Sequence, residues 1–272
     1  MFKKFFVITA LILFVSSNCF AAPAGNTSDP KIPYGPGISN LQDSGFGALK
    51  LGIDVDCIFE RKLDGDEAVT EADLEGQMYL LRLGYTIADR IEPYLKLGVS
   101  HLKTGWTQNS TDIRARGENA LAVGFGAKAL LFEVPEHKVR FTLDGQYLYT
   151  DPDIEEAGVG TPGRTVSSTE FKITQWQFTA VLSKEFVFDS DGSNSADPYS
   201  LIPYIGVGFI DSENEVEFTY SGTEYSMDAT GNENKFLLIT GCDITSPENI
   251  ALSLEGRWVG ETAISTGCTL KF

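Results

Sequence analysis

Histidine is the usual general base of hydrolytic enzymes, and this chain has only two histidines. His137 lies in the short segment Glu133–Lys138, where we expect a solvated turn. His101 follows an apolar run and lies close to Lys103, where we expect a polar residue at a membrane boundary. No local hydrolase motif surrounds either histidine, although a nucleophile and a base on different strands need only meet in space. These residues favour a protein that is not an enzyme.

Clustered carboxylates are the second set of residues with possible chemistry. Calcium takes six to eight oxygen ligands, several of them from carboxylates, but the segment Asp64–Glu67 lacks the full spacing of an EF-hand loop. Solvated acidic loops and a cation site therefore both remain open, and we assign no metal and no cofactor. The clusters are Asp64, Asp66, Glu67, Glu71 and Asp73; Asp151, Asp153, Glu155 and Glu156; and Glu213, Glu215 and Glu217.

Charged residues of both signs recur at alternating positions within otherwise apolar runs. Buried charges persist when they are paired and hydrogen-bonded, so residues of this kind on one inner surface predict a network of salt bridges. The predicted network consists of Asp54, Arg82, Lys96, Lys128, Arg140, Asp144, Glu255 and Arg257. Lys172 belongs to the same charged faces. Cys57, Cys242 and Cys268 have no metal-ligand spacing, and we interpret them as small apolar residues.

The elements that carry these charges have a period of two residues, which is the period of a β-strand. In the first run, residues 49, 51, 53, 55, 57 and 59 are apolar, whereas Lys50, Gly52, Asp54, Asp56 and Glu60 form the other face. Ten such runs predict ten antiparallel strands, with a range of eight to twelve. They cover 49–60, 78–85, 91–101, 120–132, 139–149, 169–188, 202 to about 220, 236–242, 250–258 and 264–272.

The sixth run changes phase. Phe171 and Ile173 share one apolar face, but Trp176, Phe178 and Leu182 fall on the other. A β-bulge near Thr174 or Gln175 would explain the change, because a bulge inserts one extra residue into a strand. We therefore expect Phe171 and Ile173 to face outward.

The links between runs alternate in length. Segments 86–90, 133–138 and 245–249 are short, and 189–200 is a longer member of this set. Segments 62–73, 103–117, 150–168 and 211–234 are long and polar, and a tight hairpin is expected at Gly260–Glu261. Short turns at one end and long loops at the other are typical of outer-membrane barrels.

The N-terminus predicts export. Lys3 and Lys4 precede the apolar run Phe5–Val15 and small residues up to Ala22, which is the order of a secretory signal peptide cut after Ala21. A lipoprotein acylated at Cys19 is the alternative. Residues 22–44 are expected to form an irregular extension, either disordered or tucked into the barrel mouth through Ile32, Tyr34 and Ile38. Residues 45–272 are expected to form the barrel.

Charge and hydropathy narrow the choices further. The whole chain carries −17, and cleavage after Ala21 removes two lysines and no acid, so the mature chain carries −19. Such an acidic chain is a poor binder of nucleic acid. No stretch beyond the leader has the roughly 20 apolar residues of a membrane helix. Aromatic rings at the ends of the apolar faces, such as Tyr85, Trp176 and Trp258, favour a barrel in lipid over a soluble β-sandwich.

The tail carries a resemblance. Ile264, Thr266, Cys268, Leu270 and Phe272 alternate up to a terminal aromatic residue. This segment resembles the C-terminal targeting strand of Gram-negative outer-membrane proteins, and residues 45–272 resemble the small outer-membrane β-barrels of the OmpA-like and porin-like groups. The resemblance implies that Phe272, Leu270 and Cys268 act as an assembly signal. It also implies outer-membrane lipid, lipopolysaccharide and the outer-membrane assembly machinery as partners, with no indication of the oligomeric state.

Comparison with outer-membrane enzymes supports the absence of catalysis. Omptin-like proteases place Asp two residues before His, where this chain has Val99 and Pro135. Lipid A deacylases place Ser two residues after His, where it has Lys103 and Val139. A barrel of eight to ten strands has room for little besides its own side chains. We therefore expect a structural or loop-presenting barrel with a filled, charged lumen. A narrow porin-like channel is the alternative, and an enzyme is a further one.

Overall fold

The computed structural model describes residues 48–65, 69–88, 90–160, 166–188, 199–246 and 249–272. The predicted leader, the N-terminal extension with Ile32, Tyr34 and Ile38, and residues 45–47 lie outside this part of the chain. None of the helices within the described ranges combines the length and apolar character needed to cross a membrane.

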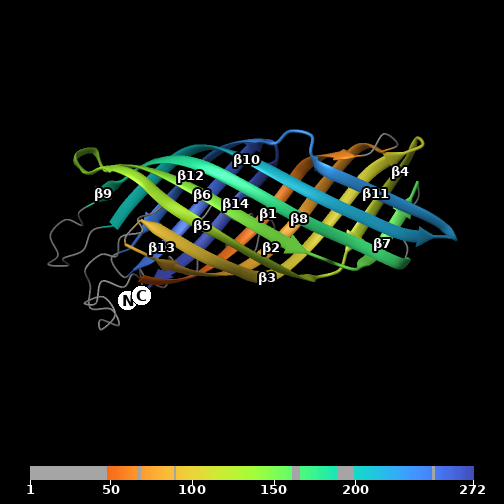
Figure 1. Ribbon diagram of the computed structural model, residues 1–272, viewed down its shortest axis with the longest axis horizontal. Coiled ribbons are helices and arrows are strands. Elements are labelled where there is room, and N and C mark those ends of the chain that lie inside the picture. The colour runs from red at the N-terminus through yellow and green to blue at the C-terminus, as the bar shows by residue number, and fades with distance from the viewer. Residues whose placement is uncertain (1–47, 66–68, 89, 161–165, 189–198, 247–248) are drawn as a thin grey trace, which may run out of the picture.

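Ten strands close into a ring by antiparallel pairing of each strand with its two neighbours (Figure 1). The prediction of an all-β closed barrel of about ten strands is therefore confirmed. The ring is formed by β1 (Ala48–Gly65), β2 (Val69–Thr86), β3 (Ile91–Gln108), β5 (Ala120–Val134), β6 (Val139–Thr150), β8 (Ser167–Lys184), β10 (Tyr199–Tyr220), β12 (Phe236–Thr245), β13 (Ile250–Val259) and β14 (Thr262–Lys271).

Three further strands extend the barrel at the end opposite the C-terminus, as Figure 1 shows at the right of the view. β4 (Thr111–Gly117) pairs with β3 and with β7 (Ile154–Val159), and β11 (Thr223–Asn232) pairs with both β10 and β1. At the other end lie the short β9 (Phe186–Phe188) and the one-turn 3-10 helix η1 (Pro135–His137). The segments expected to be long loops are therefore largely strand.

A continuous zone of outward-facing apolar residues surrounds the ring, and we call it the apolar belt. Alternate residues point to opposite sides of a strand, so these side chains face away from the lumen, and many of them are more than one third exposed. Examples with their exposed fractions are Ile53 58%, Leu95 61%, Leu121 63%, Phe125 52%, Phe178 53%, Ile205 55% and Leu254 56%. Such a surface is matched to hydrocarbon, because a soluble protein rarely exposes large contiguous apolar patches.

Beyond the belt the polarity of the wall is reversed: apolar side chains face the interior and polar side chains face outward. We call this part the crown; it comprises β4, β7, β11 and residues 60–65, 69–76, 100–108, 167–175 and 212–220 of the long strands. Its interior is an apolar core that joins opposite walls, where the rings of Trp106 on β3 and Phe218 on β10 lie 6.0 Å apart. Its outward side chains are polar, as along Glu213, Glu215 and Glu217.

The phase change in the sequence of β8 is caused by this reversal of polarity between the belt and the crown. The predicted bulge is therefore wrong. The register of β8 with β6 and β10 runs without a shift through Thr174 and Gln175. Phe171 and Ile173 are buried in the crown core instead of facing outward. Lys172, expected among the lumen charges, lies on the outer surface 3.0 Å from Glu215. The strand stays regular, and only its surroundings change from lipid to water.

A real irregularity occurs in β1, where the register shifts between Ile58 and Arg61. The shift turns Glu60 outward, whereas regular alternation places it in the lumen, and brings Arg61 into the interior, where it is 1% exposed. Bulges of this kind re-aim side chains. This bulge supplies the barrel with a central cation.

Candidate functional site

The lumen inside the belt holds the predicted charged residues. All eight are buried, with exposed fractions between 0% and 5%. They come from six strands of the ring: Asp54 from β1, Arg82 from β2, Lys96 from β3, Lys128 from β5, Arg140 and Asp144 from β6, and Glu255 and Arg257 from β13. The structure brings most of them into two adjoining clusters and places Arg140 apart from both, near the C-terminal end of the barrel.

The first cluster centres on Glu261, in the tight turn between β13 and β14. Its carboxylate accepts hydrogen bonds from Arg61 Nε at 2.9 Å and from Arg257 Nε at 2.5 Å, so one acid joins two arginines. Arg257 also pairs with Asp56 at 2.7 Å and lies 3.6 Å from Glu255. These five residues form what we call the Glu261 cluster.

Arg61 connects the Glu261 cluster to two further strands by hydrogen bonds across the lumen. Its Nη1 donates to Gln175 Oε1 on β8 and to Ser212 Oγ on β10, each at 2.8 Å. One guanidinium thus connects β1, the β13–β14 turn, β8 and β10. The planar five-donor geometry of arginine suits such multiple contacts. The consequence is a charged crossbar directly beneath the apolar core of the crown.

The second cluster fills the lumen nearer the C-terminal end. Arg82 lies 3.2 Å from Asp54, and Lys96 lies 3.9 Å from the same carboxylate. Lys96 Nζ also donates to Gln146 at 2.7 Å. Tyr94 donates its hydroxyl proton to Asp144 at 2.8 Å. Lys50 forms an ion pair with Glu92, which joins the cluster at its lower edge.

Arg140 lies at the end of the lumen that carries the short turns. It pairs with Glu133 at 3.2 Å and with Glu185 at 2.9 Å, and Glu185 also accepts from Ser200 at 2.7 Å. These contacts tie β5, β6 and β10 together at the barrel rim. Arg140 therefore belongs to a closing contact at the mouth and not to the central clusters.

The buried charges are almost balanced. Among the described residues, eight lysines and arginines and seven acids are buried, so the lumen is close to neutral although the chain carries −17. Among the described residues, acids outnumber bases at positions that are not buried. Near neutrality allows the desolvation cost of each buried ion to be offset by a neighbour of opposite sign.

Sequence reasoning missed the centre of the network. Arg61 was hidden by the bulge in β1, and Glu261 by its place in a turn, where alternation assigns no face. Lys50 and Asp56 had been placed on the inner face without a role, and Glu92 follows the first residue of its strand. Position within the alternation gave no signal for Arg61, which directly follows the predicted run 49–60, or for Glu261, which lies in the predicted hairpin turn.

Two buried tyrosines help to fill the lumen by lying over glycines of the neighbouring strand. A Cβ on Gly126 would stand 2.4 Å from the Tyr94 ring, and one on Gly241 would stand 2.2 Å from the Tyr204 ring. Tyr204 donates to Glu255 at 3.1 Å, which links its ring to the Glu261 cluster. Glycine at these two positions gives the rings their space.

The histidines do not join the lumen. His101 faces outward on β3 just beyond Val99, the last belt residue of that strand, and its side chain is hydrogen-bonded to Asn119. His137 lies in η1 at the opposite end of the barrel and is exposed. Of the acidic clusters, Glu155, Glu156, Glu213, Glu215 and Glu217 are exposed, whereas Asp66 and Glu67 lie outside the described residues. Glu224 raises the pKa of Glu217 by electrostatic repulsion and a shared hydrogen bond. Among the described residues no group of three or more potential ligands is placed to hold a metal ion.

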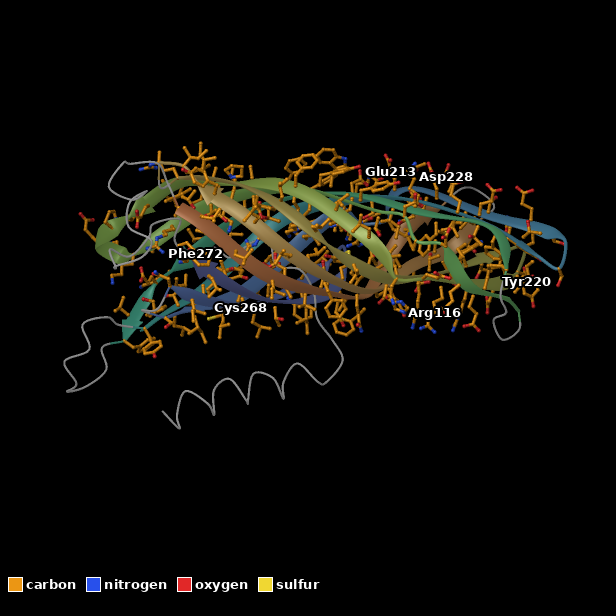
Figure 2. The ribbon with its side chains drawn as sticks, turned by 90° about the horizontal axis from the view of Figure 1, so that it is seen from below. Arg116, Glu213, Tyr220, Asp228, Cys268 and Phe272 are labelled. Atoms are coloured by element: carbon orange, nitrogen blue, oxygen red, sulfur yellow. The ribbon has the colours of Figure 1, made fainter. Side chains whose placement is uncertain are left out.

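The residues of the proposed assembly signal lie on β14 and directly after its last residue. Phe272 is 41% exposed and Leu270 39% exposed, while Cys268 is partly buried. Figure 2 shows Cys268 and Phe272 on the same outer side of the barrel. The three residues face the membrane side of the wall in the alternation that the sequence indicates.

No family model matches the chain, and no curated protein matches it. Solved structures similar to it include the outer membrane protein OprG from Pseudomonas aeruginosa, at 10% identity over 84% of this chain and 96% of that one, with a TM-score of 0.43. Another is the outer membrane protease OmpT from Escherichia coli, at 8% identity, 83% and 96% coverage and a TM-score of 0.42. A third is the toluene transporter TbuX from Ralstonia pickettii, at 8% identity, 83% and 88% coverage and a TM-score of 0.33.

Likeness at this level transfers no ligand and no activity to this chain. The class of protein is inferred from the geometry of this chain itself. The ring is closed by hydrogen bonds, as a sheet that spans lipid must be. Its wall is apolar outside and charged inside, with short turns at one end and long excursions at the other. The chain is therefore an outer-membrane β-barrel protein.

Proposed function

We propose that this protein is a non-enzymatic barrel with a closed lumen, which anchors the crown in the outer membrane and presents its outer surface. The observation that carries the proposal is the crossbar formed by Arg61, Glu261 and Arg257. Arg61 and Arg257 are each 1% exposed and Glu261 is 2% exposed, so no water-filled passage reaches them. Salt bridges across the lumen favour structural closure over conduction.

The crown supports the same proposal. Its apolar core contains Trp106, Phe171 and Phe218, which are at most 2% exposed and lie above the crossbar. An apolar core of this kind excludes water and ions. A solute would have to pass both the core and the crossbar, so two consecutive barriers oppose transport along the barrel axis.

A narrow channel is the second candidate, and one observation favours it. Gln177, Asn214 and Ser253 are buried on the inner wall, and each has side-chain polar atoms with no hydrogen-bond partner among the residues that the structure describes. Such atoms are commonly satisfied by bound water. Water at these positions is compatible with a closed lumen, but a connected file of water would provide a narrow path.

Single-channel recording in planar bilayers separates the two candidates. Purified protein, with folding verified by heat-modifiable gel mobility, is expected to give no sustained conductance steps. Sustained steps that change in size in Gln177→Leu would overturn the closed lumen and support the channel. The matched control is Trp176→Leu, the neighbouring residue on the lipid side, which should leave any such steps unchanged.

Enzyme activity is tested at His101. We expect the purified protein to hydrolyse neither phospholipid nor peptide substrates in detergent micelles. Hydrolysis that is present in the native chain and lost in His101→Ala would contradict the non-enzymatic assignment. His137→Ala serves as the control, because His137 lies exposed at the opposite end of the barrel.

A further inference from the structure

The crown consists of two packed sheets that are joined along one side by a short contact. One sheet contains β1, β2, β3 and β4, and the other contains β8, β10 and β11. In the described part of the chain, β11 and β1 share two residue pairs with an irregular register between them, and one backbone bond from Glu233 N to Lys62 O at 3.1 Å. We call these contacts the seam. The residue pairs are Leu63 with Asn232 and Gly65 with Ala229.

Like charges face each other where β11 lies on β10. Glu215 on β10 pairs directly with Asp228 on β11. Glu217 is repelled by Glu224 and shares a hydrogen bond with it. Like charges directly opposite each other destabilise a strand pair. Residues 223–232 include no basic residue, so β11 brings no cation of its own to relieve the repulsion.

The other charged groups near this surface do not balance the acids. Lys172 lies 3.0 Å from Glu215 and Lys235 lies 2.8 Å from Asp211, so both lysines are already paired. Glu170 on β8 pairs directly with Glu217 and adds a further acid. Figure 2 shows Glu213 and Asp228 on the same side of the crown. The exposed charged residues of the seam itself are Lys62, Asp64 and Glu233.

The inner side of the same hairpin contains two unsatisfied asparagines. Asn214 on β10 is 0% exposed and Asn232 on β11 is 2% exposed. Neither side-chain amide has a hydrogen-bond partner among the residues that the structure describes. Burial of an amide without a partner is unfavourable. Water that enters at the seam would satisfy both groups, so it offsets part of the cost of opening.

The seam lies next to the crossbar. On β10, Ser212 accepts a hydrogen bond from Arg61 at 2.8 Å and is two residues from Asn214. On β1, Arg61 is two residues from Leu63, which pairs with Asn232 across the seam. Separation of β11 from β1 would therefore bring water to the crossbar from the side of the crown, without a path through the lumen below it.

We propose that β11 is a strap that opens reversibly from β1, admits water to the crossbar, and closes as the acids on its outer face become protonated. The raised pKa of Glu217 has the matching direction, because repulsion by Glu224 disfavours the charged form. The closed strap is favoured below the ordinary carboxyl pKa, and this advantage is lost as pH rises through the raised pKa. The strap goes beyond the closed lumen of the proposed function, and either can fail without the other.

The first test compares thiol labelling at two matched positions of the crown core. Ala229→Cys lies on β11 and Ala115→Cys on β4 of the opposite sheet, and the two alanines are 0% and 2% exposed. Each is introduced into a full chain in which Cys57, Cys242 and Cys268 are alanine, and is treated with a water-soluble maleimide in detergent micelles. At low salt and about pH 8, A229C should react at least about tenfold faster than A115C, because local opening precedes global unfolding. Equal rates at the two positions would overturn the strap.

The second test asks whether acid closes the strap. The ratio of the two labelling rates removes the intrinsic pH dependence of the thiol. We expect this ratio to fall at least about threefold between about pH 8 and about pH 5, and to fall also in raised salt, which screens the repulsion.

A pair of double variants identifies the acids that control the strap. E217Q/E224Q removes two opposing acids and should lower the ratio of labelling rates at about pH 8 by at least about threefold. E155Q/E156Q, which removes two exposed acids of β7, should leave the ratio unchanged. A ratio that responds to neither pH nor E217Q/E224Q, or that falls equally in both double variants, would overturn closure by these acids. Heat-modifiable mobility confirms that each variant is folded.

Discussion

The belt and the crown are built from the same strands with opposite arrangements of polarity. On β10, Ile205 and Phe209 face outward in the belt while Tyr204 faces inward and is bonded to Glu255. Farther along the same strand, Glu213 and Glu217 face outward while Val216 and Phe218 are buried. The alternation never changes phase on this strand. The comparison teaches that the surrounding solvent, and not the backbone, determines which side of the wall is apolar.

The two regions also differ in what holds opposite walls together. Ion pairs and hydrogen bonds cross the lumen in the belt, where the outer wall already provides the apolar surface that lipid requires. In the crown, water surrounds the wall, so burial of apolar side chains between the walls supplies the stabilisation. Four substitutions test this contrast, beginning with the largest expected effect.

Glu261→Gln should be the most destabilising change. It removes the carboxylate shared by Arg61 and Arg257 and leaves two buried guanidinium groups without their strongest partner. Breaking a buried ion pair costs about 3–5 kcal/mol. The measurement is equilibrium urea unfolding in lipid vesicles, followed by tryptophan fluorescence. Glu213→Gln, an exposed acid of the crown, is the control and should change the free energy of unfolding by less than about 0.5 kcal/mol. Similar values for both would refute the role of the crossbar.

Phe218→Ala should come next, at about 3–4 kcal/mol, because it opens a cavity in the crown core. Phe218 is 0% exposed and contacts Trp106 and Tyr225. The lipid-facing Phe209→Ala, on the same strand, should cost less than half as much. Amide hydrogen exchange should show the loss of protection in the crown with the belt still protected. Uniform loss along β10 would mean that the crown and the belt are one cooperative unit.

Ile205→Lys should cost about 2–4 kcal/mol, because it places a charge on the lipid face near the middle of the belt. Glu213→Lys, eight residues farther along the same outward face, should change stability by less than about 0.5 kcal/mol. Refolding yield into vesicles and urea unfolding both report the difference. Equal tolerance at the two positions would show that the surface around Ile205 does not contact hydrocarbon.

Glu224→Gln should have the smallest effect on stability, and its main consequence is a change in the pKa of Glu217. Repulsion from Glu224 raises the pKa of Glu217, so the substitution should return that pKa toward its ordinary value. A raised carboxyl pKa contributes stability below the unfolded-state pKa, and this contribution is lost as pH rises through the folded-state pKa. The variant should therefore gain a little stability at neutral pH and none in acid. Carbon-detected NMR measures the pKa directly, and Glu213→Gln, which leaves Glu224 in place, should leave it unchanged.

Much of the ring could be predicted because lipid imposes a strict rule on each strand. The residues at 49, 51, 53 and 55 could be assigned to the outer face, and the charges at 54 and 82 to the lumen, since each strand crosses a uniform apolar layer. The crown could not be predicted in this way. Phe171 and Ile173 have the alternation of belt residues but lie beyond the lipid. The prediction assumed that the whole strand was surrounded by lipid, and it therefore explained the phase change by a bulge instead of by a change of solvent.

The centre of the lumen was hidden for different reasons. Arg61 reaches the interior only because β1 contains a bulge, and a bulge leaves no residue pattern distinct enough to locate it in this chain. Glu261 lies in a turn, where no alternation applies. Both residues acquire their partners from strands far away in sequence, 200 residues apart in the case of the Arg61–Glu261 bond. The pairing of such groups follows from the closed ring.

The sequence by itself determined the alternation, the approximate number of ring strands and the side of each wall that meets lipid, because these depend only on local periodicity and on the apolar character of hydrocarbon. Only the tertiary structure decided that the polar links continue as strands into a crown with a dry core, that Arg61 and Glu261 close the lumen, and that β11 meets β1 at the seam. Each of these depends on register and closure, which bring together residues whose local sequence carries no record of one another.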